Sequence, residues 1–129
     1  MSIRKIIIVD DDADDRAFFC EAVSEVDSDI ECIGLNDGEE AIRYLEKNPD
    51  DIPDYIFLDL NMPRMNGKQC LKRIKSNENL SFIPVVIYST SKSREDIVET
   101  ESLGAVCFLT KPNKFSELKL AIKKILAQN

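Results

Sequence analysis

Short apolar runs alternate along the chain with longer stretches in which apolar residues recur every three or four positions. Runs such as Tyr55–Leu58 and Val85–Tyr88 are continuous, which is typical of strands that are covered on both faces. The longer stretches have the spacing of amphipathic helices, as at Phe115, Leu118 and Ile122. We therefore predict five strands, each followed by a helix, at Lys5–Val9, Glu31–Leu35, Tyr55–Leu58, Val85–Tyr88 and Val106–Leu109.

Signals for helix boundaries support this division. Asp37 with Glu40, and Ser93 with Asp96, have the spacing of a capping box at the start of a helix. Gly104 follows the fourth helical stretch, where a left-handed residue commonly ends a helix. An alternation of strands and helices produces parallel strands joined by right-handed crossovers. The predicted fold is therefore α/β, a doubly wound (βα)5 five-stranded parallel sheet with helices on both faces.

Polar residues gather where the predicted strands end. In a sheet of this type, ligands bind beyond the carboxyl ends of the strands, so these residues are expected to share one edge. Three of the ends carry aspartate, one carries hydroxyl groups and one carries a lysine. We therefore predict a site at this edge, made of Asp10, Asp11 and Asp12; Asn36 and Asp37; Asp59; Ser89, Thr90 and Ser91; and Thr110, Lys111 and Pro112.

Three of these carboxylates, those of Asp10, Asp11 and Asp59, repel one another if they lie together. At a separation of ~4 Å and an effective dielectric constant near 20, each like-charge pair costs about 4 kcal/mol. Lys111 supplies one compensating charge, and a divalent cation can supply the rest. Mg²⁺ commonly takes one or two carboxylates together with water and a phosphate. The sequence therefore favours a Mg²⁺ site at these carboxylates.

Aspartate is also favoured at the start of helices, so each carboxylate has a simpler interpretation as a cap or a solvated loop residue. We adopt that interpretation for Asp12, Asp14 and Asp15, which precede or open the first helix. It does not account for the joint placement of the remaining site residues, which are Asp10, Asp11, Asp59, Ser89 and Lys111.

Composition limits the function classes. The chain has 129 residues, enough for one domain with its own core, and no apolar run approaches the ~20 residues of a membrane span. It also lacks the pattern of a signal peptide. Lys and Arg total 17 against 24 acidic residues, a net charge of −7, which argues against binding nucleic acid through its phosphates. These features predict a single domain over residues 1–129, cytoplasmic, with neither nucleic acid nor membrane as a partner.

The cysteine and histidine counts narrow the chemistry further. Cys20, Cys32, Cys70 and Cys107 are widely separated, lie in apolar stretches and include no CxxC pair. We expect them to be reduced core residues of a cytoplasmic protein. The chain contains no histidine, which removes His-based acid–base catalysis, Ser-His-Asp triads and most zinc sites.

Two rival motifs fail on the acidic segment that begins at Asp10. A calcium loop finds acidic residues in register as far as Glu21, but Asp15 occupies the position of its required glycine, and a strand rather than a helix precedes it. A flavodoxin-like phosphate loop needs Ser, Thr and Gly after the first strand, where this chain has carboxylates. The glycine-rich nucleotide-binding motifs are absent from the sequence.

The sequence resembles the receiver domains of bacterial two-component response regulators. The resemblance spans almost the whole chain and rests on four fragments in order: the acidic pair in IIIVDD, the block IFLDLNMPRMNG, the hydroxyl end VVIYSTS, and FLTKP at the fifth strand. It implies the strand order 2-1-3-4-5 of a flavodoxin-like sheet. The length is similar to that of a stand-alone receiver without an output domain.

The resemblance also implies a role for each site residue. Asp59 would accept a phosphoryl group. Asp11 and Asp59 would bind Mg²⁺ directly, with a further ligand from the backbone carbonyl of Asn61 and a contact from Asp10 through water. Lys111 would contact a phosphoryl oxygen.

Two further residues would form a switch. Ser89 would hydrogen-bond another phosphoryl oxygen, and Phe108 would change rotamer with it, altering the face made by the fourth helix, fifth strand and fifth helix. Ser89 in place of the commoner Thr, and Phe108 in place of the frequent Tyr, are mild departures from the family. The Lys111–Pro112 bond would be cis.

The implied function is a phosphoryl-accepting signalling switch. A partner phosphohistidine, on a sensor histidine kinase or a histidine phosphotransfer protein, would supply the phosphoryl group, and a downstream protein would read the change. Such a switch is not an enzyme in its own right, since it catalyses only its own phosphorylation and dephosphorylation. Two alternatives stay open: a pseudo-receiver that binds proteins without being phosphorylated, and a haloacid-dehalogenase-like phosphatase. The intact acidic, hydroxyl and lysine positions count against the first, and Asn61, where the second needs a carboxylate, counts against the other.

Overall fold

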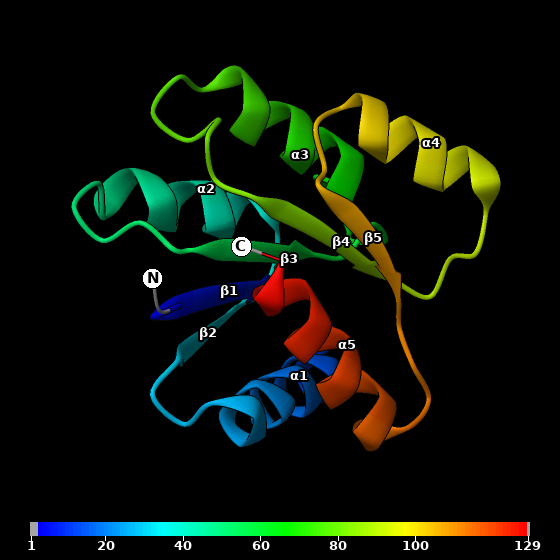
Figure 1. Ribbon diagram of the computed structural model, residues 1–129. Coiled ribbons are helices and arrows are strands. Elements are labelled where there is room, and N and C mark those ends of the chain that lie inside the picture. Colours follow the sequence, from blue (N-terminus) through cyan, green and yellow to red (C-terminus); the bar gives the residue numbers. More distant parts are fainter. Residues whose placement is uncertain (1–2, 129) are drawn as a thin grey trace.

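The computed structural model describes residues 3–128 and contains one sheet of five parallel strands (Figure 1). The order of the strands, β2-β1-β3-β4-β5, is the order that the family resemblance implies, so the predicted fold class is confirmed. The strands are β1 (Lys5–Val9), β2 (Glu31–Leu35), β3 (Tyr55–Leu58), β4 (Val85–Ser89) and β5 (Cys107–Thr110). The helices are α1 (Ala13–Val26), α2 (Gly38–Lys47), α3 (Gly67–Ser76), α4 (Arg94–Ser102) and α5 (Phe115–Ala127).

The sheet divides the core into two layers. Side chains alternate between the faces of a strand, so Ile7 and Val9 point to one layer and Ile6 and Ile8 to the other. In Figure 1, α2, α3 and α4 cover the first face, and α1 and α5 cover the second. All residues of β1 are buried, as predicted for a strand covered on both faces. The carboxyl ends of the parallel strands therefore meet at one edge.

Polar side chains begin the first four helices. Asp12, Asp37, Asn66 and Ser93 each accept a hydrogen bond from a backbone N–H of the first turn. Asp37 and Ser93 therefore cap their helices as predicted, but within the described residues the reciprocal bond of a capping box is made only at Asn66, by Gln69. Gly104 has a φ of 108° after α4, the left-handed conformation predicted for it. Local sequence signals thus account for where these helices begin and where α4 ends.

The expectation that all four cysteines are reduced is wrong for two of them. Cys20 of α1 and Cys32 of β2 form a disulfide, with their Cα atoms 5.5 Å apart. A search for CxxC spacing misses such a pair, because packing of α1 on β2 brings together residues that are 12 positions apart. Cys70 and Cys107 are free, and burial raises the pKa of the Cys70 thiol to about 12.

Two further expectations concern the backbone and the membrane. No peptide bond of the described chain is cis, so the cis Lys111–Pro112 bond implied by the family resemblance is not found. The trans form is the lower in energy for most X–Pro bonds. No helix within residues 3–128 is long and apolar enough to cross a membrane.

Candidate functional site

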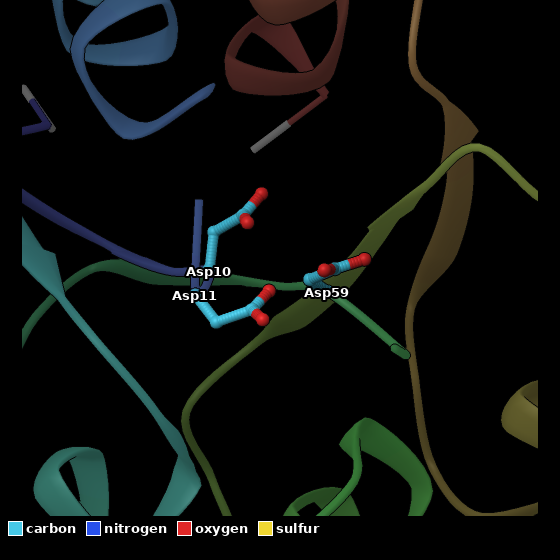
Figure 2. A group of neighbouring side chains, drawn as sticks. All are labelled: Asp10, Asp11 and Asp59. Atoms are coloured by element: carbon cyan, nitrogen blue, oxygen red, sulfur yellow. The ribbon is translucent and has the colours of Figure 1, made fainter. Parts of the chain in front are cut away.

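The acidic residues predicted from the strand ends lie together at the edge of the sheet. Val9 of β1 pairs with Leu58 of β3, so Asp10 and Asp59 leave adjacent strands at the same level. One carboxylate oxygen from each of Asp10, Asp11 and Asp59 lies within 4.8 Å of the others (Figure 2). Asp10 and Asp59 are buried, whereas Asp11 is exposed. The predicted clustering of the three carboxylates is therefore present.

Lys111, which follows β5, reaches into this cluster. Its ammonium lies 2.7 Å from a carboxylate oxygen of Asp10 and 2.8 Å from one of Asp15, but 3.9 Å from the nearest oxygen of Asp59. The ring of Tyr88 packs against the same ammonium, with its centroid at 5.2 Å. Asp15, interpreted from the sequence only as a residue of the first helical turn, is thus a direct partner of the lysine.

Burial and charge act in opposite directions on Lys111. Burial alone would lower the pKa of the ammonium, but its hydrogen bonds to Asp10 and Asp15 outweigh this effect and raise the pKa above its usual value. The lysine therefore stays cationic throughout the physiological range.

For Asp59, burial outweighs the effect of the neighbouring positive charge. Burial raises the pKa of its carboxyl from the ordinary 3.8 to about 6. The positive charge of Lys111 lowers it, the negative charge of Asp10 raises it, and backbone N–H groups of Leu60 and Asn61 donate to the carboxylate and lower it again. Asp59 is therefore ionised at neutral pH but poorly solvated, and it gains from any additional positive charge.

Asp10 is fixed by bonds on both its backbone and its side chain. Its carboxylate accepts from the Asp12 N–H at 2.9 Å as well as from Lys111. Arg16 of α1 donates to the Asp10 carbonyl at 2.6 Å and to the Asn36 side chain at 3.0 Å. These bonds tie the turn after β1 to the end of β2.

The loop after Asp59 is held tightly against α3. A Cβ added at Gly67 would lie 2.6 Å from the Cα of Leu60, so no larger side chain fits there without displacing the loop. The Gly67 N–H donates to the Leu60 carbonyl at 2.9 Å. Farther along the loop, Arg64 has a φ of 65°, and its guanidinium lies 2.8 Å from the Asp37 carboxylate. These contacts fix the backbone that carries Asp59.

The hydroxyl end of β4 lies beside the acidic cluster. β4 pairs with β3, with Ile87 opposite Leu58, and Ser89 ends β4 two residues later. Ser89 is buried, and its Oγ accepts from the Ser91 N–H at 3.2 Å. The Lys111 N–H donates to the Ser89 carbonyl at 2.7 Å, which joins the hydroxyl end directly to the lysine end.

Asp11 faces an open pocket of about 440 Å³. Its carboxylate has no hydrogen bond or ion pair within the described part of the chain. Carboxylate oxygens are the donors that hard divalent cations prefer, and one of the three here is unpaired and exposed to solvent. The donor set therefore fits a divalent cation. The pocket is lined by Asp11, Leu60, Asn61, Met62, Pro63, Asn66, Lys68 and Asp96.

The site is suited to phosphoryl chemistry. It places the ionised, poorly solvated Asp59 beside a lysine, an unpaired carboxylate and a hydroxyl. Comparison with known families agrees: the model of the response regulator receiver domain matches residues 6–123. The chain belongs to the response regulator receiver domain family. This assignment agrees with the fold and with the resemblance carried by the four sequence fragments.

Individual relatives extend over most of this receiver domain. Response regulator Rcp1 of Synechocystis sp. is 33% identical over 117 residues, which cover 88% of this chain and 80% of Rcp1. The crystal structure of the phosphorylated cyanobacterial phytochrome response regulator RcpA has a TM-score of 0.86 and 35% identity, covering 96% of this chain and 91% of RcpA. The Mn²⁺-bound form of Rcp1 has a TM-score of 0.82 and 32% identity, covering 95% and 91%.

Other relatives carry the receiver domain as part of a longer protein. The protein-glutamate methylesterase/protein-glutamine glutaminase of Bacillus subtilis is 35% identical over 125 residues, which cover 96% of this chain but 33% of that enzyme. This chain therefore spans about a third of the length of that enzyme.

Proposed function

We propose that this receiver domain is a phosphoryl-accepting signalling switch in which Asp59 is the acceptor. The observation that carries the proposal is the environment of Asp59: a buried carboxylate, with a pKa of about 6, beside two other carboxylates and a lysine. A group in that position is short of positive charge, and phosphoryl transfer to it brings a metal and a phosphate into the same place.

Mg²⁺ is the proposed metal. Asp11, Asp59 and the backbone carbonyl of Asn61 would hold it directly, and Asp10 would assist through water. The unpaired Asp11 carboxylate and the fit of the donor set support this assignment, as does the Mn²⁺-bound form of the relative Rcp1. The ion supplies positive charge that offsets the repulsion between Asp59 and an anionic phosphoryl donor.

The transfer itself involves one bond formed and one broken. A carboxylate oxygen of Asp59 attacks the phosphorus of a partner phosphohistidine, the P–N bond breaks, and the imidazole leaves with the electron pair and takes up a proton. The product is an acyl phosphate. Lys111 and Ser89 donate hydrogen bonds to its phosphoryl oxygens, which stabilises charge on them. Water later attacks the same phosphorus and releases inorganic phosphate and the free carboxylate.

The phosphoryl donor is a protein other than this one, because the chain has no histidine. A sensor histidine kinase or a histidine phosphotransfer protein meets this requirement. The output is a change of shape rather than a reaction on a substrate: Ser89 moves towards the phosphoryl group, Phe108 follows, and the face made by α4, β5 and α5 changes for a downstream protein.

The proposal predicts Mg²⁺-dependent labelling at Asp59. Incubation with a small acyl phosphate should add one phosphoryl group to the wild-type protein in Mg²⁺ and none in a chelator, as read by intact-mass spectrometry. Asp59→Asn should abolish the label, because an amide cannot form the acyl phosphate. Asp50→Asn, an exposed position in the loop before β3, is the matched control and should label normally. Full labelling of Asp59→Asn, or labelling in chelator, contradicts the proposal.

A further inference from the structure

Asp15 is placed to control the lysine of the site. It lies in the first turn of α1, and its carboxylate is 2.8 Å from the Lys111 ammonium, across 96 positions of the chain. The same ammonium bonds Asp10 at 2.7 Å and stands off from Asp59 at 3.9 Å, which is too long for a hydrogen bond. In the unphosphorylated protein, the hydrogen bonds of Lys111 thus go to residues other than the proposed acceptor, with which it makes only a longer ion pair.

We infer that Asp15 is a positioning residue: it holds Lys111 away from Asp59 and thereby sets how readily Asp59 takes a phosphoryl group. The inference rests on the proposed function and adds to it a residue that contacts neither the metal ligands nor the phosphoryl group. The inference rests on three observations: the hydrogen bonds that Lys111 already makes, the burial of its two partners, and the charge of Asp15.

Two of the three N–H donors of Lys111 are already engaged. An ammonium has three N–H bonds; two point to the carboxylates of Asp10 and Asp15, and the ring of Tyr88 occupies a further side. The side chain is 11% exposed, so there is little room for it to turn without losing a partner. A movement of the ammonium towards a phosphoryl group on Asp59 therefore weakens one of the two existing ion pairs.

Asp15 is the partner that can be given up. The Asp10 carboxylate is 1% exposed and also accepts from the Asp12 N–H, so loss of the lysine leaves a buried charge poorly compensated. The Asp15 carboxylate is 41% exposed, and water can replace the lysine there. The movement of Lys111 towards a phosphoryl group is accordingly a movement away from Asp15.

The charge of Asp15 opposes phosphorylation in two ways. It stabilises the resting position of Lys111, and it repels a phosphoryl group, which carries roughly −1.5 to −2 of charge. Both effects favour the unphosphorylated arrangement over the phosphorylated one, and only such a difference between states shifts the equilibrium. Removal of this one charge should therefore make Asp59 a better acceptor.

A purely structural role for Asp15 predicts an effect on the stability of α1 rather than on phosphorylation. An acidic residue in the first turn stabilises a helix through a favourable interaction with the helix dipole, and Asp14 shares that turn. Asp14 is exposed, and within the described residues its side chain has no ion pair. Asp14→Asn thus removes the same charge from the same turn without touching Lys111, which makes it the matched control.

The test compares wild type, Asp15→Asn, Asp15→Glu and Asp14→Asn. The first readout is the affinity for beryllofluoride, a mimic of the phosphoryl group, measured by amide NMR titration in saturating Mg²⁺. The second is the rate of labelling by a small acyl phosphate, measured by intact-mass spectrometry. Asp15→Asn should bind beryllofluoride and label roughly three- to fivefold better, the size expected when a half-exposed ion pair is lost. Asp15→Glu should restore wild-type behaviour, and Asp14→Asn should stay within about 1.5-fold of wild type. Thermal unfolding of both Asn variants measures the helix contribution separately.

Two results overturn the inference while leaving the proposed function intact: equal behaviour of Asp15→Asn and Asp14→Asn, or weaker binding and slower labelling in Asp15→Asn. The first means that Asp15 acts only as a general or helical charge. The second means that it assists the lysine rather than restraining it. If the wild-type protein neither binds beryllofluoride with Mg²⁺ nor labels at Asp59, the proposed function and the inference fail together.

Discussion

Asp59 combines burial with a negative charge, and its neighbours only partly relieve the conflict. Lys111 is 3.9 Å away and shared with Asp10 and Asp15, so its charge does not offset the burial. The result is a pKa of about 6 for a carboxyl that ordinarily titrates at 3.8. A proposed acceptor that is costly to keep ionised also lowers the stability of the resting protein.

This cost predicts a pH-dependent effect of Asp59→Asn in metal-free buffer. Because the pKa of Asp59 is higher in the folded protein than in the unfolded chain, the folded state binds the proton more tightly, and stability is lost as pH rises from about 4 through about 6. Asp59→Asn should therefore raise the free energy of unfolding by on the order of 2–3 kcal/mol at pH 7.5, and by under about 1 kcal/mol at pH 4.

Urea denaturation in a chelator at the two pH values measures the effect. Asp50→Asn, which removes an exposed carboxylate, should change the free energy of unfolding little at either pH. An Asp59→Asn variant that is no more stable than wild type at pH 7.5 would show that the surroundings of Asp59 already compensate its charge.

At the residue scale, the sequence could predict the cluster but not all of its bonds. Asp10, Asp11 and Asp59 were predictable because a parallel sheet brings strand ends together, whatever the side chains between them. The pairing of Asp15 with Lys111 was not, because it depends on how the first turn of α1 faces the loop after β5. The favourable place of an acidic residue in a first helical turn already explained Asp15, so nothing in the sequence pointed beyond it.

At the element scale, the sequence predicted the strands well but not the contacts between elements. Apolar periodicity predicted β1, β2 and β3 at their observed bounds. The fifth strand was predicted one residue too early, because Val106 is apolar yet 57% exposed, and β5 begins at Cys107. The link between α1 and β2 through Cys20 and Cys32 was missed altogether, since sequence spacing alone does not reveal the packing of a helix on a strand.

The disulfide between α1 and β2 should contribute to stability. It closes a loop of 12 residues, and loops of this size are worth roughly 2–3 kcal/mol by restriction of the unfolded chain. Reduction should lower the melting temperature of wild type by roughly 10 °C. A Cys20→Ser, Cys32→Ser double variant should melt at the lower temperature with or without reductant.

Differential scanning calorimetry with and without reductant, together with thiol counting by alkylation and mass spectrometry, tests this. The non-reduced protein should expose two alkylatable thiols after denaturation, those of Cys70 and Cys107. Cys107→Ser should keep the full response to reductant, which makes it the matched control. Four alkylated thiols in protein kept from reductant would exclude the disulfide.

At the scale of the whole molecule, the site and the proposed output face are connected through β4 and β5. Ser89 ends β4 with its side chain on the same face of the sheet as Ile87, and Ile87 pairs with Phe108 of β5. Phe108 packs against the same core layer and borders a small cavity of about 40 Å³ below α4. The serine and the phenylalanine therefore lie on one face, with space available beside the ring.

Apolar residues are also exposed on or next to the elements of the proposed output face. Val98 of α4, Val106 before β5 and Leu120 of α5 are each more than half exposed. The proposed movement of Ser89 and Phe108 would change the arrangement of this face for a partner protein.

This connection predicts that Ser89→Ala separates phosphorylation from its readout. The variant keeps Asp59, Asp11 and Lys111, so it should still bind beryllofluoride in Mg²⁺. It lacks the hydroxyl that is proposed to move towards the phosphoryl group, so most of the amide shift changes in α4 and β5 should disappear. The coupling at stake is ~1–3 kcal/mol, the usual range for two linked sites.

Phe108→Ala should lose the same distant changes while leaving those around Asp59 intact, because it removes the second half of the movement. Ser81→Ala, a serine before β4 at the opposite end of the sheet, should respond as wild type does. Wild-type shift changes across α4 and β5 in Ser89→Ala would mean that the signal leaves the site by another route, even with Asp59 as the acceptor.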